Sequence, residues 1–149
     1  MKRDKIIATR PNEHSRAYFK LLETANWIEM KVKEVLNNYQ LTHAQFNILM
    51  ILRENHPEPV SAGDLKEKLI FKNSDVTRLL DRMVKKGMVE RYICPSNRRK
   101  LDITISGKAM EMLELVVPEI TVAVEHFYRN KITAEEAIAL TATLNKIRN

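Results

Sequence analysis

The sequence is poor in the residues that crosslink a chain or break its regular structure. It has one cysteine in 149 residues, which excludes an internal disulfide and is typical of proteins of a reducing cytosol. Only three glycines accompany 44% hydrophobic and 30% charged residues, a composition that favours a helix-rich, soluble globular protein. The length suits one domain with its own core.

Long hydrophobic runs are absent as well. No stretch of the sequence approaches the roughly 20 apolar residues of a membrane helix. Residues 1–14 contain no apolar run long enough for a signal peptide. We therefore expect a cytoplasmic protein with no membrane partner.

Patterns that carry catalysis or hold a metal are also missing. The four histidines (His14, His43, His56 and His126) are scattered without a paired spacing, so they do not predict a zinc site. The sequence contains no glycine-rich phosphate loop, nucleophile elbow or carboxylate pair. We expect no enzymatic activity, no catalytic residue, no metal and no cofactor.

The chain does contain a concentrated positive charge. It has 25 Lys and Arg against 19 Asp and Glu, a net charge of +6. Nine of these basic residues and three of the acidic ones lie between Lys72 and Lys100, which leaves sixteen of each sign elsewhere. Because the excess charge lies on one predicted helix and one predicted hairpin, a polyanion such as nucleic acid is the favoured partner.

Hydrophobic spacing predicts three helices before the cationic segment. Apolar residues recur in steps of three and four from residue 15 to about 39, which indicates one long helix. Thr42 and Gln45 form the pattern of a capping box for a second helix, which ends before Pro57. Ser61 begins a third, shorter helix.

A helix and a hairpin follow. The helix is predicted to be capped by Asn73 or Ser74 and to end at Gly87, where glycine permits a left-handed conformation. Strand patterns then occur at 88–94 and 101–105, joined by the basic loop 95–100. Two short helices followed by a hairpin predict a winged helix-turn-helix, whose second helix enters the major groove of DNA.

Two more helices complete the chain. Ser106 and Gly107 begin a long helix that contains Pro118, and a second capping-box pattern at Thr133 begins the last one. We expect its apolar residues to be buried, namely Ala137, Leu140, Leu144 and Ile147. A small domain rarely needs a helix of about 24 residues for its own core, so part of the apolar surface is expected to meet a second subunit.

Four segments in this order carry a resemblance to a known family. They are LTHAQFNIL, SAGDLKEKL, NSDVTRLLDRMVKKGMVER and PSNRRKLDITISGKAM, and they resemble the MarR family of bacterial transcription regulators. The similarity covers about 41–110. It implies a homodimer on a roughly palindromic operator in double-stranded DNA, most often acting as a repressor, and small aromatic or phenolic effectors. The usual wing has Asp-Arg-Arg, whereas Asn97 stands in the place of the acid here.

The expected fold is mainly α with a small β-hairpin. It is a single MarR-like domain over 1–149, with a DNA-binding lobe at about 41–106 and long N- and C-terminal dimerisation helices at about 14–39 and 107–149.

We expect the DNA-binding residues on the second helix of the motif and on the wing. Asn and Arg side chains recognise base edges, and wing arginines suit the negative minor groove. The expected residues are Lys72, Asn73, Ser74, Asp75, Thr77, Arg78, Arg82, Arg98, Arg99 and Lys100. Weaker phosphate contacts are expected from Ser61, Lys66, Lys85, Lys86 and Arg91. A solvated surface is the alternative for the basic residues, a purely capping role is the alternative for Asn73 or Ser74, and Arg82 could instead pair with Asp81. Asp75 would contact a cytosine amine or favour the helix dipole.

Three alternatives stay open. Tyr18, Phe19, Trp27 and Met30 either line an effector pocket or pack in a core or dimer interface. Cys94 either senses oxidants or is a half-buried strand residue. The whole motif could also bind another protein, without specific affinity for DNA.

Overall fold

The computed structural model describes residues 12–70, 72 and 75–149, so the expectations for Asn73 and Ser74 lie outside the described residues. The elements are α1 (Glu13–Asn37), α2 (His43–Asn55), β1 (Val60–Ser61), α3 (Ala62–Lys68), α4 (Val76–Lys85), β2 (Val89–Ile93), β3 (Leu101–Ile105), α5 (Gly107–Tyr128) and α6 (Ala134–Arg148). This is the mainly helical fold with a small hairpin that the sequence predicts.

Local capping signals place most helix starts where the sequence predicts them. At α2, the Gln45 amide donates to Thr42 Oγ1 at 3.2 Å and the Thr42 amide donates to Gln45 Oε1 at 3.1 Å. The capping box at Thr133 and the cap at Ser106 also form. Each of these side chains satisfies an amide that has no partner within its helix.

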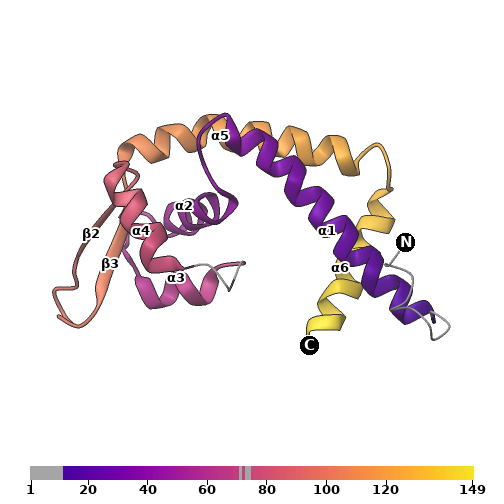
Figure 1. Cartoon of the computed structure of the whole chain (residues 1–149), viewed down its shortest axis with the longest axis horizontal. Helices are drawn as coiled ribbons and strands as arrows, with labels where there is room; N and C mark the ends of the chain where they lie inside the picture. Colours follow the sequence, from indigo (N-terminus) through magenta and orange to yellow (C-terminus); the bar gives the residue numbers. More distant parts are fainter. Residues whose placement is uncertain (1–11, 71, 73–74) are drawn as a thin grey trace, which may run out of the picture.

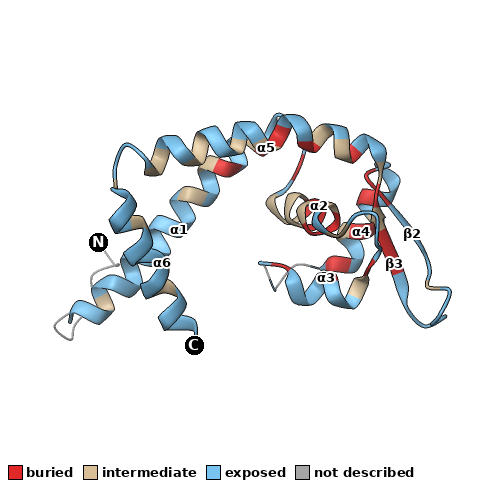
Figure 2. Ribbon diagram, turned by 180° about the vertical axis from the view of Figure 1, so that it is seen from behind, coloured by how far each residue is buried: buried red, intermediate tan, exposed pale blue. Residues whose placement is uncertain are grey.

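The sheet and four helices form one lobe around a buried core. The strands are antiparallel in the order β1-β3-β2, and β2 and β3 are the predicted hairpin. The buried residues of Figure 2 gather on α2, α3, α4, the sheet and the first half of α5. Fully enclosed residues of this core include Leu49, Leu65, Leu80, Ile103 and Leu113.

The remaining helices extend away from the lobe as an arm. Figure 1 shows an arch in which α5 crosses the top, α1 descends obliquely from near the middle of α5, and α6 descends on the side opposite the hairpin. Along α1 only Val32 and Leu36 are buried. None of the described helices has the length and apolar character needed to cross a membrane.

The predicted burial of the α6 stripe is wrong for the single chain. Helix α6 has no buried residue; Ala137 and Leu144 are half-buried, while Leu140 and Ile147 are exposed. Periodicity correctly indicates that these residues share one side of a helix, but the chain itself places too little against that side to cover it.

Two glycines provide a matched test of local backbone requirements. Gly87 has φ +68° and Gly107 begins α5, and a Cβ at either position would meet no atom within 4 Å. We expect Gly87→Ala to lower the free energy of unfolding by about 1–2 kcal/mol, because only the left-handed backbone is penalised. Gly107→Ala should instead raise it by about 0.5–1 kcal/mol, since alanine restricts the unfolded chain and favours a helix. Urea unfolding of both variants measures the difference, and equal effects would contradict this reading.

Candidate nucleic-acid interface

Helix α4 separates an apolar side from a cationic side. Val76, Leu80 and Met83 are buried against the lobe. The exposed residues of α4 are Thr77, Arg78, Arg82, Lys85 and the apolar Val84. The core therefore determines which side chains of α4 face outward, and it presents three cations and a hydroxyl together.

The start of α4 differs from the prediction. Its cap is Asp75, neither Asn73 nor Ser74, and Asp75 Oδ1 accepts from the Arg78 amide at 3.2 Å. Asp75 Oδ2 also lies 3.3 Å from Arg78 Nε. The carboxylate thus satisfies the helix start and holds the exposed guanidinium beside it, which explains an acid in this cationic segment without any contact to a base.

The wing is a hydrogen-bonded turn with exposed cations. The Cys94 amide donates to the Lys100 carbonyl at 3.0 Å, and the Lys100 amide donates to the Asn97 carbonyl at 2.9 Å. Asn97 Oδ1 accepts from the Arg99 amide at 3.1 Å, so the amide side chain organises the turn through a backbone contact. Arg98, Arg99 and Lys100 are all exposed.

Several of the predicted phosphate contacts have partners within the protein. Arg91 Nη1 of β2 lies 2.7 Å from Asp81 Oδ1 of α4, so Asp81 is the partner of Arg91 and the considered pair with Arg82 is not the one that forms. Lys72 Nζ donates to the Glu67 carbonyl. Ser61 Oγ accepts from the Asp64 amide at 3.1 Å and caps α3. Lys66, like Lys85, is exposed.

The C-terminal end of α4 is hydrogen-bonded to the turn after α1 and to the start of α5. Lys86 Nζ donates to the Gln40 carbonyl at 3.2 Å, and Lys108 Nζ donates to the Lys86 carbonyl at 3.1 Å. Ser106 Oγ donates to the Gly87 carbonyl at 2.7 Å. Lys86 is therefore a positioning residue in the single chain. Its partners lie 46 and 22 residues away, and no sequence pattern identifies them.

A second long-range contact joins α5 to the turn after α1. The Tyr39 hydroxyl donates to Glu119 Oε1 at 2.5 Å, and this hydrogen bond raises the pKa of Tyr39. Gln40 follows in a left-handed conformation with φ 54°. The carbonyl that receives Lys86, the residue directly after α4, thus lies one residue from Tyr39, whose side chain binds α5.

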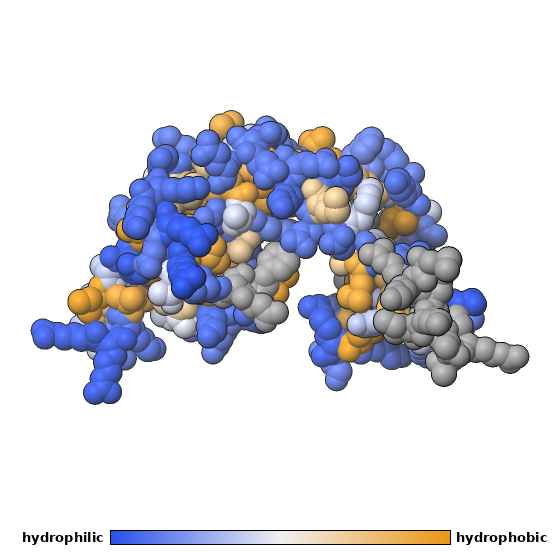
Figure 3. Space-filling view, in the orientation of Figure 1, coloured by the Kyte–Doolittle hydropathy of each residue, from blue (hydrophilic) through white to orange (hydrophobic). Residues whose placement is uncertain are grey.

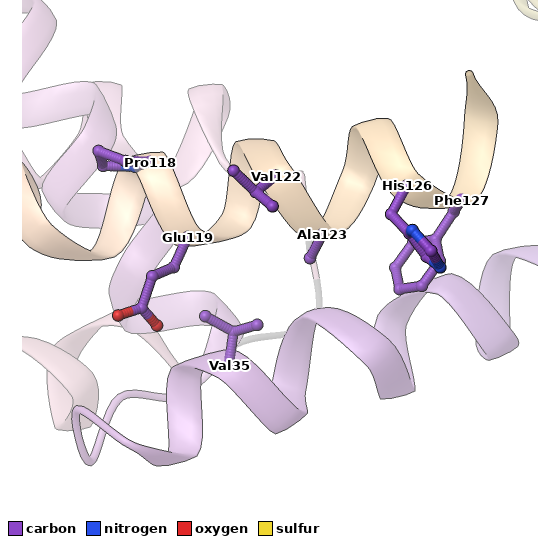
Figure 4. Close-up of a pocket in the computed structure, with 7 residues that line it drawn as sticks. All are labelled: Val35, Pro118, Glu119, Val122, Ala123, His126 and Phe127. Atoms are coloured by element: carbon purple, nitrogen blue, oxygen red, sulfur yellow. The ribbon is translucent and has the colours of Figure 1, made fainter. Parts of the chain in front are cut away.

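An apolar groove lies beside this contact. Figure 4 shows Val35 of α1 pointing toward α5, and Glu119, Ala123 and Phe127 of α5 pointing toward α1. None of the four residues expected in an effector pocket lines this groove: Tyr18, Phe19, Trp27 and Met30 are all exposed. Trp27 comes nearest to it, because its ring packs edge-on against Phe127 at 5.1 Å between centroids.

Cys94 follows directly after β2 and is half-buried, with its Sγ 3.2 Å from Ser96 Oγ.

Burial lowers the pKa of His43, while the charge of Glu29 opposes that shift. Within residues 12–70, 72 and 75–149, no group of three or more His, Cys, Asp or Glu side chains could hold a metal ion.

Comparison with known proteins shows which family this part of the chain resembles. The model of the MarR family matches residues 41–101, from the buried Leu41 to the first residue of β3. YsmB of Bacillus subtilis (strain 168), an uncharacterized HTH-type transcriptional regulator, is 29% identical over 147 residues, which are 96% of this chain and 97% of YsmB. Residues 41–101 of this chain therefore match the MarR family.

Solved structures of the MarR family share the fold. A mutant MarR from E. coli complexed with operator DNA has a TM-score of 0.80 and 23% identity, covering 94% of this chain and 99% of that one. Sco3205 of Streptomyces coelicolor, a MarR family transcriptional regulator in complex with DNA, has a TM-score of 0.81 and 20% identity, covering 91% and 86%. Members of the MarR family are transcription regulators and not enzymes.

The two roles of Asp75 can be separated by substitution. Asparagine caps helices as well as aspartate does, so Asp75→Asn should preserve the free energy of unfolding while Asp75→Ala lowers it by about 1 kcal/mol. Asp75→Asn also removes a negative charge beside Arg78 and should leave affinity for duplex DNA unchanged or higher. Urea unfolding and DNA titration of both variants test this. A loss of affinity in a stably folded Asp75→Asn variant would show that the carboxylate itself contacts DNA.

Proposed function

We propose that this chain is a MarR-family regulator, an effector-responsive repressor that binds a palindromic operator as a homodimer. In each subunit, α4 would enter a major groove and the wing a flanking minor groove. The observation that carries the proposal is the presentation of exposed cations by two rigid elements of one lobe, α4 and the hairpin tip. The DNA complexes of Sco3205 and of E. coli MarR, which share this fold, support it.

Under this proposal the expected DNA-binding residues fall into two groups, those that are exposed and those that are held by partners within the protein. Thr77, Arg78 and Arg82 are exposed on α4 and would approach bases or phosphates there, with Arg78 paired to Asp75 in the single chain. Arg98 and Arg99 would do so from the wing. Arg91 and Lys86 would act indirectly, since each is held by a partner within the protein. Asn73 and Ser74 belong to the same proposed surface but lie outside the described residues.

The proposed partner of the arm is a second copy of this chain. Large apolar side chains remain exposed on all three arm helices, among them Leu22 of α1, Val122 of α5 and Ile138 of α6. Burying such a surface stabilises association by roughly 25 cal/mol per Å² of apolar area. Two copies related by a two-fold axis would present their α4 helices to half-sites about 10 bp apart.

We propose that a small aromatic or phenolic effector occupies the groove between α1 and α5. The groove has a volume of about 600 Å³, which is typical of small-molecule sites. Glu119 lines it and binds Tyr39, and the next carbonyl in the chain, that of Gln40, receives Lys86 of α4. A ligand that displaced Tyr39 from Glu119 would therefore act on the position of α4 and shift the protein away from its DNA-binding state.

The wing arginines give the proposal a salt-dependent test. Each lost phosphate-type contact should reduce the slope of log affinity against log salt by about one, so Arg98→Ala should weaken binding to every duplex and flatten that slope. Lys146→Ala, which removes an exposed cation from the distant α6, is the matched control. Titrations use the promoter DNA upstream of the protein's own gene, with excess non-specific competitor.

Two outcomes would contradict the proposal. Unchanged affinity and slope for Arg98→Ala would remove the wing from the interface. Only weak, salt-sensitive binding of the wild-type protein, with no preference for any sequence selected from random DNA, would favour the protein-interaction module instead.

The dimer is tested by a charge placed on α6. Ile138 is 70% exposed on the arm and Ile70 is 71% exposed on the lobe. An aspartate at either position should therefore lower the free energy of unfolding of the single chain by an equally small amount. We expect Ile138→Asp to yield monomers by light scattering, because a buried unpaired carboxylate opposes association, whereas Ile70→Asp remains dimeric. A dimeric Ile138→Asp variant, or a monomeric wild type, would refute the proposed interface.

A further inference from the structure

We infer that Ile93 and Leu101 of the hairpin form an apolar contact surface for the deoxyribose edges of the DNA strand that runs between α4 and the wing. This inference rests on the proposed function. It assigns to the wing a second, uncharged role beside that of its arginines.

The strand register places these two residues on the core-facing side of the hairpin. Three directly opposed pairs lie on this side, Val89 with Ile105, Arg91 with Ile103, and Ile93 with Leu101. The residues of the pair nearest the core, Val89 and Ile105, are 2% and 6% exposed, whereas Ile93 is 61% and Leu101 41% exposed. The apolar side of the sheet therefore continues beyond the core toward the tip.

This side of the hairpin faces α4. Arg91 lies on it, one pair nearer the core than Ile93, and reaches Asp81 of α4 at 2.7 Å. Ile93 and Leu101 thus lie between α4 and the wing tip, in the space that we call the notch. If α4 enters a major groove and the tip enters the adjacent minor groove, the sugar-phosphate strand that separates the grooves passes through this notch.

Cations border the apolar pair on both sides. Arg98, Arg99 and Lys100 follow it at the tip, and Arg82 and Lys85 are exposed on α4. Figure 3 shows hydrophobic side chains on the hairpin directly beside the hydrophilic ones that project from its tip. The charges would bind the phosphates of the strand, and the apolar pair would contact the C–H groups of the sugars between them. An anionic strand with apolar sugar edges matches both features.

A contact to deoxyribose has a distinct signature in binding experiments. It involves no charge, so its loss leaves the salt slope unchanged. It involves no base edge, so its loss weakens all sequences equally. The wing arginine variant changes the slope, and variants of the α4 side chains that contact bases change the sequence preference, so the three roles are separable.

The test is operator titration at several salt concentrations with the full chain and variants Ile93→Thr and Leu101→Thr. Threonine keeps the β-branched shape or strand preference that the hairpin needs. Since the dimer would carry two wings, we expect each variant to bind about tenfold more weakly at every salt concentration, with an unchanged slope and an unchanged ratio of operator to non-specific affinity. Tyr92→Thr, on the opposite face of the same strand, is the control for hairpin integrity and should bind within about twofold of wild type.

A ribonucleotide scan gives an independent measure. Operators that each carry one ribonucleotide present a 2′-hydroxyl at a single sugar. At the contacted sugar this hydroxyl should weaken the wild-type protein but not Ile93→Thr, so that the two changes are non-additive.

Wild-type affinity in both threonine variants, or a loss equal to that of Tyr92→Thr, would overturn the assignment while leaving the proposed function intact. Absence of specific DNA binding by the wild-type protein would overturn both.

Discussion

The proposed DNA-binding surface depends on the fixed angle between α4 and the hairpin. The ion pair between Asp81 and Arg91, at 2.7 Å, spans these two elements, and the buried Leu80 and Met83 pack α4 against the same lobe. A partly buried pair is less screened by salt than a surface pair. The hydrogen bonds of Lys86, Ser106 and Lys108 then hold the C-terminal end of α4 against the turn after α1 and the start of α5. The middle and the C-terminal end of the helix are thereby positioned by contacts that need no DNA.

Charge and apolar surface are divided between the two parts of the molecule. The net charge of +6 comes from the stretch that contains α4 and the wing, and the other residues balance to zero. The arm has no such excess but leaves large apolar side chains exposed on α1, α5 and α6. Under the proposed function, long-range attraction to a polyanion and short-range association of subunits would therefore act at opposite ends of the arch, so neither would compromise the other.

The wing combines the same two forces at a smaller scale. Its cations favour approach to any duplex, whereas the Ile93 and Leu101 pair gains free energy only when a surface of matching shape excludes water. Contact at close range would hold any bound duplex in the notch with the same free energy, whatever its sequence. In this view the sequence preference comes from α4, and the apolar pair adds affinity without changing that preference.

The sequence by itself determined the features that depend on near neighbours: the capping boxes, the left-handed Gly87, the hairpin, the order of the elements and the location of the positive charge. It missed Asp75 as the cap of α4, because several adjacent residues there are equally suitable for the role. Only the tertiary structure decided that Arg91 pairs with Asp81, that Lys86 binds the Gln40 carbonyl and that Tyr39 reaches Glu119 across 80 residues. Only it showed that the α6 stripe is uncovered in the single chain. Periodicity arises from helix geometry within one segment, whereas pairing and burial depend on what other segments the folded chain places beside it.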